Sequence, residues 1–158
     1  MKIRIAKLDE VPQVRRWLVD TAKWLDAKDI HQWERFLVYE ATKVCLKDYY
    51  NNKLFVLLDN NENMVGALSY GGDPEEIDKK LWEDYESAYF IHRIVVGKQY
   101  RGMKYGEYMI RWAKKLAMKD NREVRLNCVE CNDYLYKYYQ AQGFKYCGSK
   151  MGYHLFRA

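Results

Sequence analysis

Apolar residues recur along the chain at two spacings, every second residue in some segments and every third or fourth residue in others. Alternation is typical of half-buried strands, and the longer spacing is typical of helices that bury one face. The pattern predicts strands at 2–6, 53–59, 64–70, 88–97, 123–129, 145–150 and 153–158. It predicts helices that begin near residues 9 and 30, a short helix within 73–85, and longer helices at about 104–119 and 132–142.

Three of the predicted helices have a recognisable apolar face. The first is expected to start at a cap on Asp9, with Pro12 in its first turn. Its face is predicted to consist of Val11, Val14, Trp17, Leu18 and Leu25. The second helical pattern consists of Ile30, Trp33, Leu37, Ala41 and Val44. The face of the helix at 104–119 is predicted to hold Tyr105, Met109, Trp112 and Leu116.

The order of these elements indicates the fold class. A strand and two helices precede a hairpin at 53–70, after which strands and helices alternate to the end of the chain. This order predicts an α/β (α+β) fold in which helices cover both faces of a sheet. A chain of 158 residues with 49% hydrophobic residues can bury one sizeable core and leaves little for a second one. We therefore expect one domain, residues 1–158.

The composition excludes several classes of protein. Charged residues make up 31% of the chain and aromatic residues 16%, which is typical neither of disordered nor of membrane proteins. The apolar stretches, such as residues 54–58, are too short to span a bilayer or to form a signal-peptide core, so we expect a cytoplasmic protein with no membrane partner. The net charge of +5 favours an anionic partner. Because basic and acidic residues are interleaved, a phosphate-bearing small molecule fits better than a DNA duplex.

An RNA-associated protein is a further interpretation, since the many tyrosines and basic residues could form a stacking surface for bases. Such a surface needs a continuous basic and aromatic stripe. Acidic residues at positions 75, 76, 78, 83, 84 and 86 interrupt any such stripe. The sequence therefore disfavours nucleic acid as a partner.

The four cysteines raise the questions of metal binding and of disulfide bonds. Cys128 and Cys131 have the two-residue spacing of a zinc half-site, but the sequence has no second pair at a matching spacing, and its three histidines are scattered. A strand would also direct these two side chains to opposite faces. We therefore predict no metal site and reduced thiols, as in a reducing compartment.

The segment 98–106 has the pattern of a strand-turn-helix junction. It follows the apolar run 89–96 and contains Gly102 and Gly106. At such a junction the first N–H groups of the helix have no intrahelical partner, and they form a ready anion site. Arg101 and Lys104 would add positive charge to that site. The same glycines could also serve only to end the strand and allow tight helix packing, and the spacing alone does not decide between these readings. The segment matches neither a Walker P-loop nor the dinucleotide fingerprint.

A second feature is the segment 132–144. Asn132 can cap a helix there, Gly143 can end it, and Leu135 and Tyr139 lie four residues apart on one face. The tyrosines of this segment could simply bury their rings and leave their hydroxyl groups to water.

Together these two segments resemble motifs of the GNAT N-acetyltransferase family, which transfers an acyl group from coenzyme A to an amine. The family's pyrophosphate motif, Arg/Gln-x-x-Gly-x-Gly/Ala after an aliphatic strand, is similar to residues 94–106, with Arg101 first and Gly106 last. Its later motif, Asn-x-x-aliphatic-x-x-x-Tyr-x-x-x-Gly-Phe, is similar to residues 132–144 at every spacing. One departure is Lys104, which stands where the family usually has glycine.

The resemblance implies a fold, a cosubstrate and a set of binding residues. The fold would be a single domain with a mixed, mostly antiparallel sheet of about six to seven strands, about four helices and splayed central strands. The cosubstrate would be acetyl-CoA, with no metal ion. The residues that bind it would be Ile94, Val95, Val96, Arg101, Gly102, Met103, Lys104, Tyr105, Gly106, Asn132 and Tyr139. Lys104 would either add a phosphate contact or weaken binding by standing at the rim of the site.

The implied reaction needs a base and an acid. An amine with a pKa of about 10 must lose a proton before it attacks the thioester, and the departing thiolate then needs one. The resemblance makes Tyr139 the general acid and the N–H of Val96 the group that polarises the thioester oxygen. The candidate base is His92, which strand alternation puts on the face of Ile94 and Val96, and histidine is a residue type suited to this task. Arylalkylamine acetyltransferases resemble this chain in placing a histidine on that strand, whereas other relatives use a glutamate or ordered water, so the base stays open.

The acceptor is open as well. In this family the acceptor cleft is built from the first two helices and the last hairpin, where Trp24, His31, Trp33 and Tyr153 would lie. A small-molecule amine and a protein amine would both fit, and the oligomeric state is undecided, a homodimer included. The alternative function is a non-catalytic acyl-CoA-binding module. Such a module would need no acid, so a tyrosine in register at Tyr139 argues against it.

Overall fold

The structure is a computed structural model that describes residues 1–158, and it has an α+β fold. Its α-helices are α1 (Val11–Asp26), α2 (Glu40–Tyr50), α3 (Glu76–Leu81), α4 (Tyr105–Lys119) and α5 (Asp133–Ala141). Its strands are β1 (Lys2–Ile5), β2 (Leu54–Leu58), β3 (Met64–Gly71), β4 (Ala88–Val96), β5 (Glu123–Val129), β6 (Lys145–Lys150) and β7 (Tyr153–Arg157). Hydrogen bonding along the seven-stranded sheet follows the order β1-β2-β3-β4-β5-β7-β6. The predicted fold class is confirmed, with five α-helices where about four were expected.

The chain divides into two compact units. The first unit comprises Met1–Ser69 and Arg93–Met109, and the second comprises Tyr70–His92 and Ile110–Ala158. In the first unit, β1 pairs with β2 and β2 with β3, both antiparallel, so the predicted hairpin of β2 and β3 is confirmed. In the second unit, β4 pairs in parallel with β5, whereas β7 pairs antiparallel with both β5 and β6. The parallel register covers the first three residues of β4 and β5, Ala88–Phe90 and 123–125, in keeping with strands that splay beyond that point.

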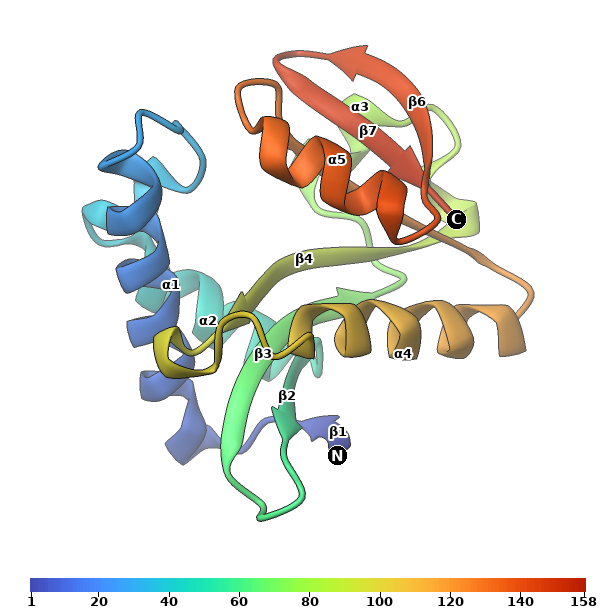
Figure 1. Ribbon diagram of the computed structural model, residues 1–158. Coiled ribbons are helices and arrows are strands. Elements are labelled where there is room, and N and C mark those ends of the chain that lie inside the picture. Colours follow the sequence, from blue (N-terminus) through green and yellow to red (C-terminus); the bar gives the residue numbers. More distant parts are fainter. The chain divides into compact units, whose positions relative to one another are not determined.

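The core of the first unit lies between its strands and the helices α1 and α2, which lie side by side (Figure 1). The predicted face of α1 is confirmed, since all five of its residues are buried. The predicted cap is wrong. Asp9 lies in a short 3-10 helix, Leu8–Glu10, and α1 starts after Glu10 with no side-chain cap. Glu10 is held instead by two hydrogen bonds from Arg4, of 2.6 and 2.8 Å, and by the N–H of Lys7 at 2.7 Å.

The second predicted helix is interrupted. Trp33 has a φ of 69°, in the left-handed region, and is followed by a 3-10 helix, Glu34–Leu37, before α2 begins at Glu40. The buried face of α2 consists of Ala41, Cys45 and Asp48. Asp48 is buried because it forms two hydrogen bonds, of 2.8 and 2.9 Å, with the Arg93 guanidinium of β4. The Asp48 carboxylate is thus buried together with the Arg93 guanidinium, which binds both of its oxygens. No spacing in the sequence indicates this pairing.

In the second unit, α5 packs against the hairpin of β6 and β7, as Figure 1 shows in orange and red.

The face of α4 differs from the predicted one. Met109, Ile110, Ala113 and Ala117 are buried, whereas Tyr105, Trp112 and Leu116 are half-buried. The alanines allow close packing along the helix, so the large residues flank the buried stripe instead of forming it.

All four cysteines are free thiols in the structure. Burial raises the pKa of Cys45 to about 11 and that of Cys128 to about 12, so these two thiols stay protonated at neutral pH. Cys131 and Cys147 are exposed. The structure contains no group of three or more histidine, cysteine, aspartate or glutamate side chains that could hold a metal ion. None of its helices combines the length and the apolar character that a membrane span requires.

Candidate active site

The predicted phosphate turn lies in the first unit, between the end of β4 at Val96 and the start of α4 at Tyr105. Gly102 and Lys104 both have a left-handed backbone, with φ values of 84° and 60°. Nothing lies within 4 Å of where a Cβ of Gly102 would stand, so this glycine is favoured for its backbone angle and not for lack of space. Lys104 has the same kind of backbone angle. Such an angle strains any residue with a Cβ, so glycine suits this position.

The first turn of α4 leaves N–H groups without a helical partner. Its first intrahelical hydrogen bond joins the N–H of Tyr108 to the carbonyl of Lys104 at 3.1 Å. The N–H groups of the four residues that precede Tyr108, from Lys104 to Glu107, come before that bond and lie at the positive end of the helix dipole. The sequence-predicted junction is therefore present, and it can hold an anion such as a phosphate group.

The side chains around this turn divide into exposed and engaged ones. Lys104 and Met103 are exposed. Arg101 is directed to α1, where its Nη2 donates a hydrogen bond of 3.2 Å to Thr21 and its guanidinium lies 4.8 Å from the centre of the Trp24 ring. Arg101 therefore ties the turn to α1 in this structure, while Lys98 and Lys104 are exposed cationic side chains of the same segment.

The strand residues before the turn alternate in burial. Val95 is buried in the core of the first unit, whereas Ile94 and Val96 are half-buried. The side chain of Val95 therefore packs inside, and Ile94 and Val96 are the partly accessible residues of this stretch. The alternation in burial extends back to His92, which is half-buried, while Arg93 between it and Ile94 is buried and has a φ of 53°.

The second predicted segment forms α5 in the second unit, with the expected ends. The Oδ1 atom of Asn132 accepts the N–H of Leu135 at 3.1 Å, so Asn132 caps the helix through its side chain. Gly143 has a φ of 76° and ends it. Lys114 donates to the carbonyl of Gln142 at 2.9 Å and so satisfies a carbonyl of the last turn.

Tyr139 is the buried tyrosine of α5, with 7% of its surface exposed, while Tyr136 and Tyr138 are half-buried. Its ring makes edge contacts with Phe144 and Phe156, at centroid distances of 6.0 and 5.6 Å. Burial raises the pKa of its hydroxyl group well above the ordinary value. Tyr139 therefore keeps its proton at any physiological pH, which a proton donor requires.

His92 lies on the part of β4 that belongs to the second unit, and its Nε2 contacts a carboxylate oxygen of Asp78 at 2.9 Å. In the sequence, Asp78 stands out only as one of the acidic residues that interrupt a basic stripe. Its spacing from Glu75 predicts a place in the cap of α3, but no sequence signal indicates its contact with His92.

The four residues predicted for the acceptor cleft have different environments. Trp24 is 43% exposed and lies between the cations of Arg101 and Lys28, the latter 4.2 Å from its ring centre. His31 is exposed, and its hydrogen bond with Glu34 raises its pKa. Trp33 packs on Phe36, and Tyr153 is packed against a buried cluster of the second unit.

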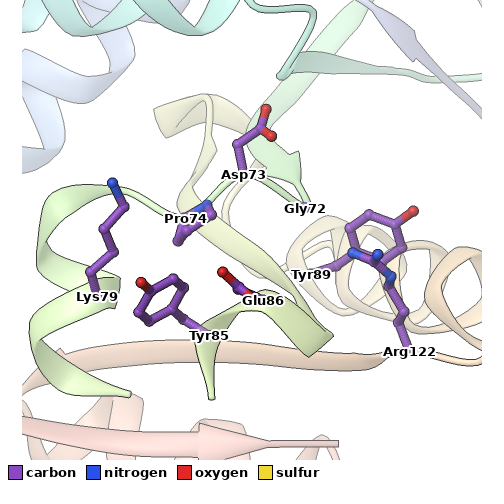
Figure 2. A pocket seen from close by; sticks show the side chains of 8 residues that line it. All are labelled: Gly72, Asp73, Pro74, Lys79, Tyr85, Glu86, Tyr89 and Arg122. Carbon is purple, nitrogen blue, oxygen red and sulfur yellow. The ribbon is translucent and has the colours of Figure 1, made fainter. Parts of the chain in front are cut away.

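The second unit also has an open hollow of about 630 Å³ that contains none of the predicted site residues. Figure 2 shows Lys79, Tyr85, Tyr89 and Arg122 among the side chains around it. Several of its polar groups have partners already. Lys79 pairs with Glu76 at 2.8 Å, the hydroxyl group of Tyr89 donates to Asp120 at 2.8 Å, and Arg122 stacks on the Tyr89 ring. The hollow therefore offers few free groups for binding a ligand.

Comparisons with known proteins agree with the fold and with the two motifs. The sequence pattern of the acetyltransferase (GNAT) family matches residues 13–144, so the chain belongs to this family and is an acyltransferase. It is 26% identical over 155 residues to a Bacillus subtilis (strain 168) protein described as the uncharacterized N-acetyltransferase YesJ, covering 96% of this chain and 86% of that one.

Solved structures are similar along the whole chain. A GNAT-family acetyltransferase from Listeria monocytogenes is 27% identical, with a TM-score of 0.81 over 99% of this chain and 93% of that one. The PaiA N-acetyltransferase of Thermoplasma acidophilum, whose structure contains coenzyme A, is 14% identical and shares the fold, with a TM-score of 0.75 over 99% of this chain and 96% of that one.

Proposed function

We propose that this protein transfers an acetyl group from acetyl-CoA to a primary amine by direct attack of the amine on the thioester. The observation that carries the proposal is the row of N–H groups from Lys104 to Glu107, at the start of α4 and directly after a strand with the family's motif. The first turn of a helix binds phosphate in this way. The coenzyme A in the Thermoplasma structure supports the same choice of cosubstrate.

The turn is expected to hold the pyrophosphate through the backbone of residues 102–106, with Lys104 adding charge at the rim. Acetyl-CoA supplies the activated acyl group when it is bound. The N–H of Val96 would donate to the thioester oxygen and stabilise the charge that develops there. Asn132 would contribute indirectly, because it fixes the start of the helix that carries Tyr139.

Tyr139 is proposed as the general acid and His92 as the base. The raised pKa of the buried Tyr139 hydroxyl keeps its proton in place at neutral pH, and this proton would pass to the sulfur as the C–S bond breaks. His92 would take the first proton from the incoming ammonium group. The second proton leaves the nitrogen as the amide forms and restores Tyr139, so the reaction releases one proton overall.

A screen of amines tests this function. The protein is mixed with acetyl-CoA and with small primary amines, polyamines or peptides that have a free N-terminus or lysine, and free thiol is followed over time. We expect thiol release that depends on one class of amine and a matching acetylated product by mass spectrometry. CoA binding without amine-dependent release across the panel would favour the alternative, a non-catalytic acyl-CoA-binding module.

A further inference from the structure

A wholly buried carboxylate lies against the proposed base. The Nε2 atom of His92 and the Oδ2 atom of Asp78, on α3, are 2.9 Å apart, and their side chains are 14% and 0% exposed. The same Oδ2 atom accepts the N–H of Glu75, so it is the acceptor of this contact as well, and Nε2 carries the hydrogen. The neutral imidazole ring then has its lone pair on Nδ1, the nitrogen that faces away from Asp78.

The cap of α3 does not by itself account for Asp78. Its Oδ2 also accepts the N–H of Glu75 at 2.7 Å, which completes a capping box. A capping carboxylate works at the protein surface, yet this one is buried, and its Oδ1 has no hydrogen-bond partner. Burying a carboxylate with an unsatisfied oxygen costs free energy that the cap could avoid. A buried polar atom without a partner is rare in native structures, and a catalytic role is one of its recognised explanations.

The surroundings hold the histidine ring in place and leave Asp78 without another cation. The His92 ring is nearly parallel to that of Phe90, with a centroid distance of 6.2 Å and an angle of 13°. Phe90 belongs to a buried cluster whose other members are Leu81, Trp82, Ala88 and Leu155. Two more titratable side chains, Tyr85 and Tyr153, pack against this cluster. Arg125 stacks on Trp82 of this cluster at 4.7 Å, but its charge is balanced by its ion pairs with Asp84 and Glu123.

We propose that Asp78 is the positioning residue of His92 and fixes its Nε2–H tautomer, so that Nδ1 can accept the proton of the acceptor. This role rests on the proposed acetyl transfer. In the step, the N–H bond of the ammonium group breaks, an Nδ1–H bond forms, and the positive charge moves to a ring that lies beside the Asp78 carboxylate. The proton passes to solvent after the product leaves.

The test combines a spectroscopic reading with kinetics. Two-bond ¹⁵N–¹H spectra of histidine-labelled protein give the tautomer of His92, assigned with His92→Gln, in wild type and in Asp78→Asn. The asparagine keeps an oxygen for the N–H of Glu75 but also has an amide donor that can face Nε2. We expect wild type to show the Nε2–H tautomer and Asp78→Asn to lose it. In Ser-His-Asp sites the corresponding change lowers kcat by about 10⁴-fold, so a loss of at least about ten-fold is expected here.

Two controls separate positioning from folding. Glu75→Ala weakens the same cap without touching His92, so it should leave turnover within about two-fold of wild type. In the His92→Gln background, Asp78→Asn should cause no further loss, because its effect acts through the ring. An unchanged tautomer in Asp78→Asn, or additive losses in the double variant, would overturn the proposal. A wild type that acetylates no amine would overturn the proposed function and this role with it, while the tautomer would still report whether the contact exists.

Discussion

The two motif-bearing regions, the turn at 101–106 in the first unit and α5 in the second, differ in the groups that they present. The turn presents backbone groups, and α5 presents side chains. The turn is exposed and offers backbone N–H groups, with Gly102 and Lys104 in left-handed conformations. In α5, by contrast, the important groups are side chains, a capping Asn132 and a buried Tyr139. Under the proposed function, the difference means that binding and chemistry would be assigned to separate groups. Substitutions in the turn should therefore change CoA affinity, and substitutions at Tyr139 should change turnover.

The largest effect is expected at Tyr139. Tyr139→Phe keeps the ring between Phe144 and Phe156 but removes the proton donor, so kcat should fall by about 10²–10⁴-fold. Steady-state kinetics with a good amine acceptor measures the change. Tyr136→Phe is the matched control on the same helix and should stay close to wild type. Near-full turnover in a folded Tyr139→Phe protein would mean that the proton comes from water or from another side chain.

The next largest effect is expected in the turn. Gly106→Glu places a carboxylate where the pyrophosphate should bind, and like charges brought together cost several kcal/mol, so CoA affinity should fall by more than about ten-fold. Gly106→Gln adds a side chain of the same size without the charge and should lose less. Calorimetric titration compares the two. Wild-type affinity in Gly106→Glu would place the phosphate elsewhere.

A smaller effect, on stability, is expected at the cap of α5. Asn132→Ala removes the acceptor for the N–H of Leu135, which should lower the free energy of unfolding by about 1 kcal/mol and Tm by about 2–4 °C. Asn132→Asp keeps an acceptor and should stay nearer to wild type. Thermal unfolding followed by circular dichroism measures both. An unchanged Tm in the alanine variant would show that the cap contributes little.

The smallest effect is expected at Lys104, where two terms oppose each other. Lys104→Gly removes a cation whose exposed contact with phosphate is worth up to about 1 kcal/mol, so CoA should bind a few-fold more weakly at low salt. It also relieves the left-handed strain, which should raise the stability of the protein by up to about 1 kcal/mol. Lys104→Asn tolerates the same backbone angle without the charge and separates the two terms. Tighter binding by Lys104→Gly would mean that the lysine obstructs the site.

The sequence was sufficient for features that depend on local spacing. The seven strands, the capped start of α5 at Asn132 and the junction before α4 were all predicted, because periodicity and capping residues act within a few positions. The errors arose where tertiary contacts outweigh spacing. Trp33 interrupts a regular helical pattern, and the alanines of α4 form its buried stripe in place of larger residues.

Long-range partners were beyond the reach of the sequence. Asp48 and Arg93 are 45 positions apart, and Asp78 and His92 are 14 positions apart on different elements, so no periodic pattern links them. The left-handed backbone of Arg93, with a φ of 53°, is likewise a feature that no sequence pattern indicates. The candidate residues themselves came from motif spacing, whereas the partners that position them came from the fold.

The most direct test of the division between a binding turn and a catalytic helix is a calorimetric titration of CoA into Tyr139→Phe, made on the same preparation whose turnover is measured. The account predicts a Kd within about two-fold of wild type, because the backbone of the turn is untouched while the proton donor is gone. A Kd that weakens in proportion to the loss of kcat would contradict it, since Tyr139 would then contribute to binding and not to proton transfer.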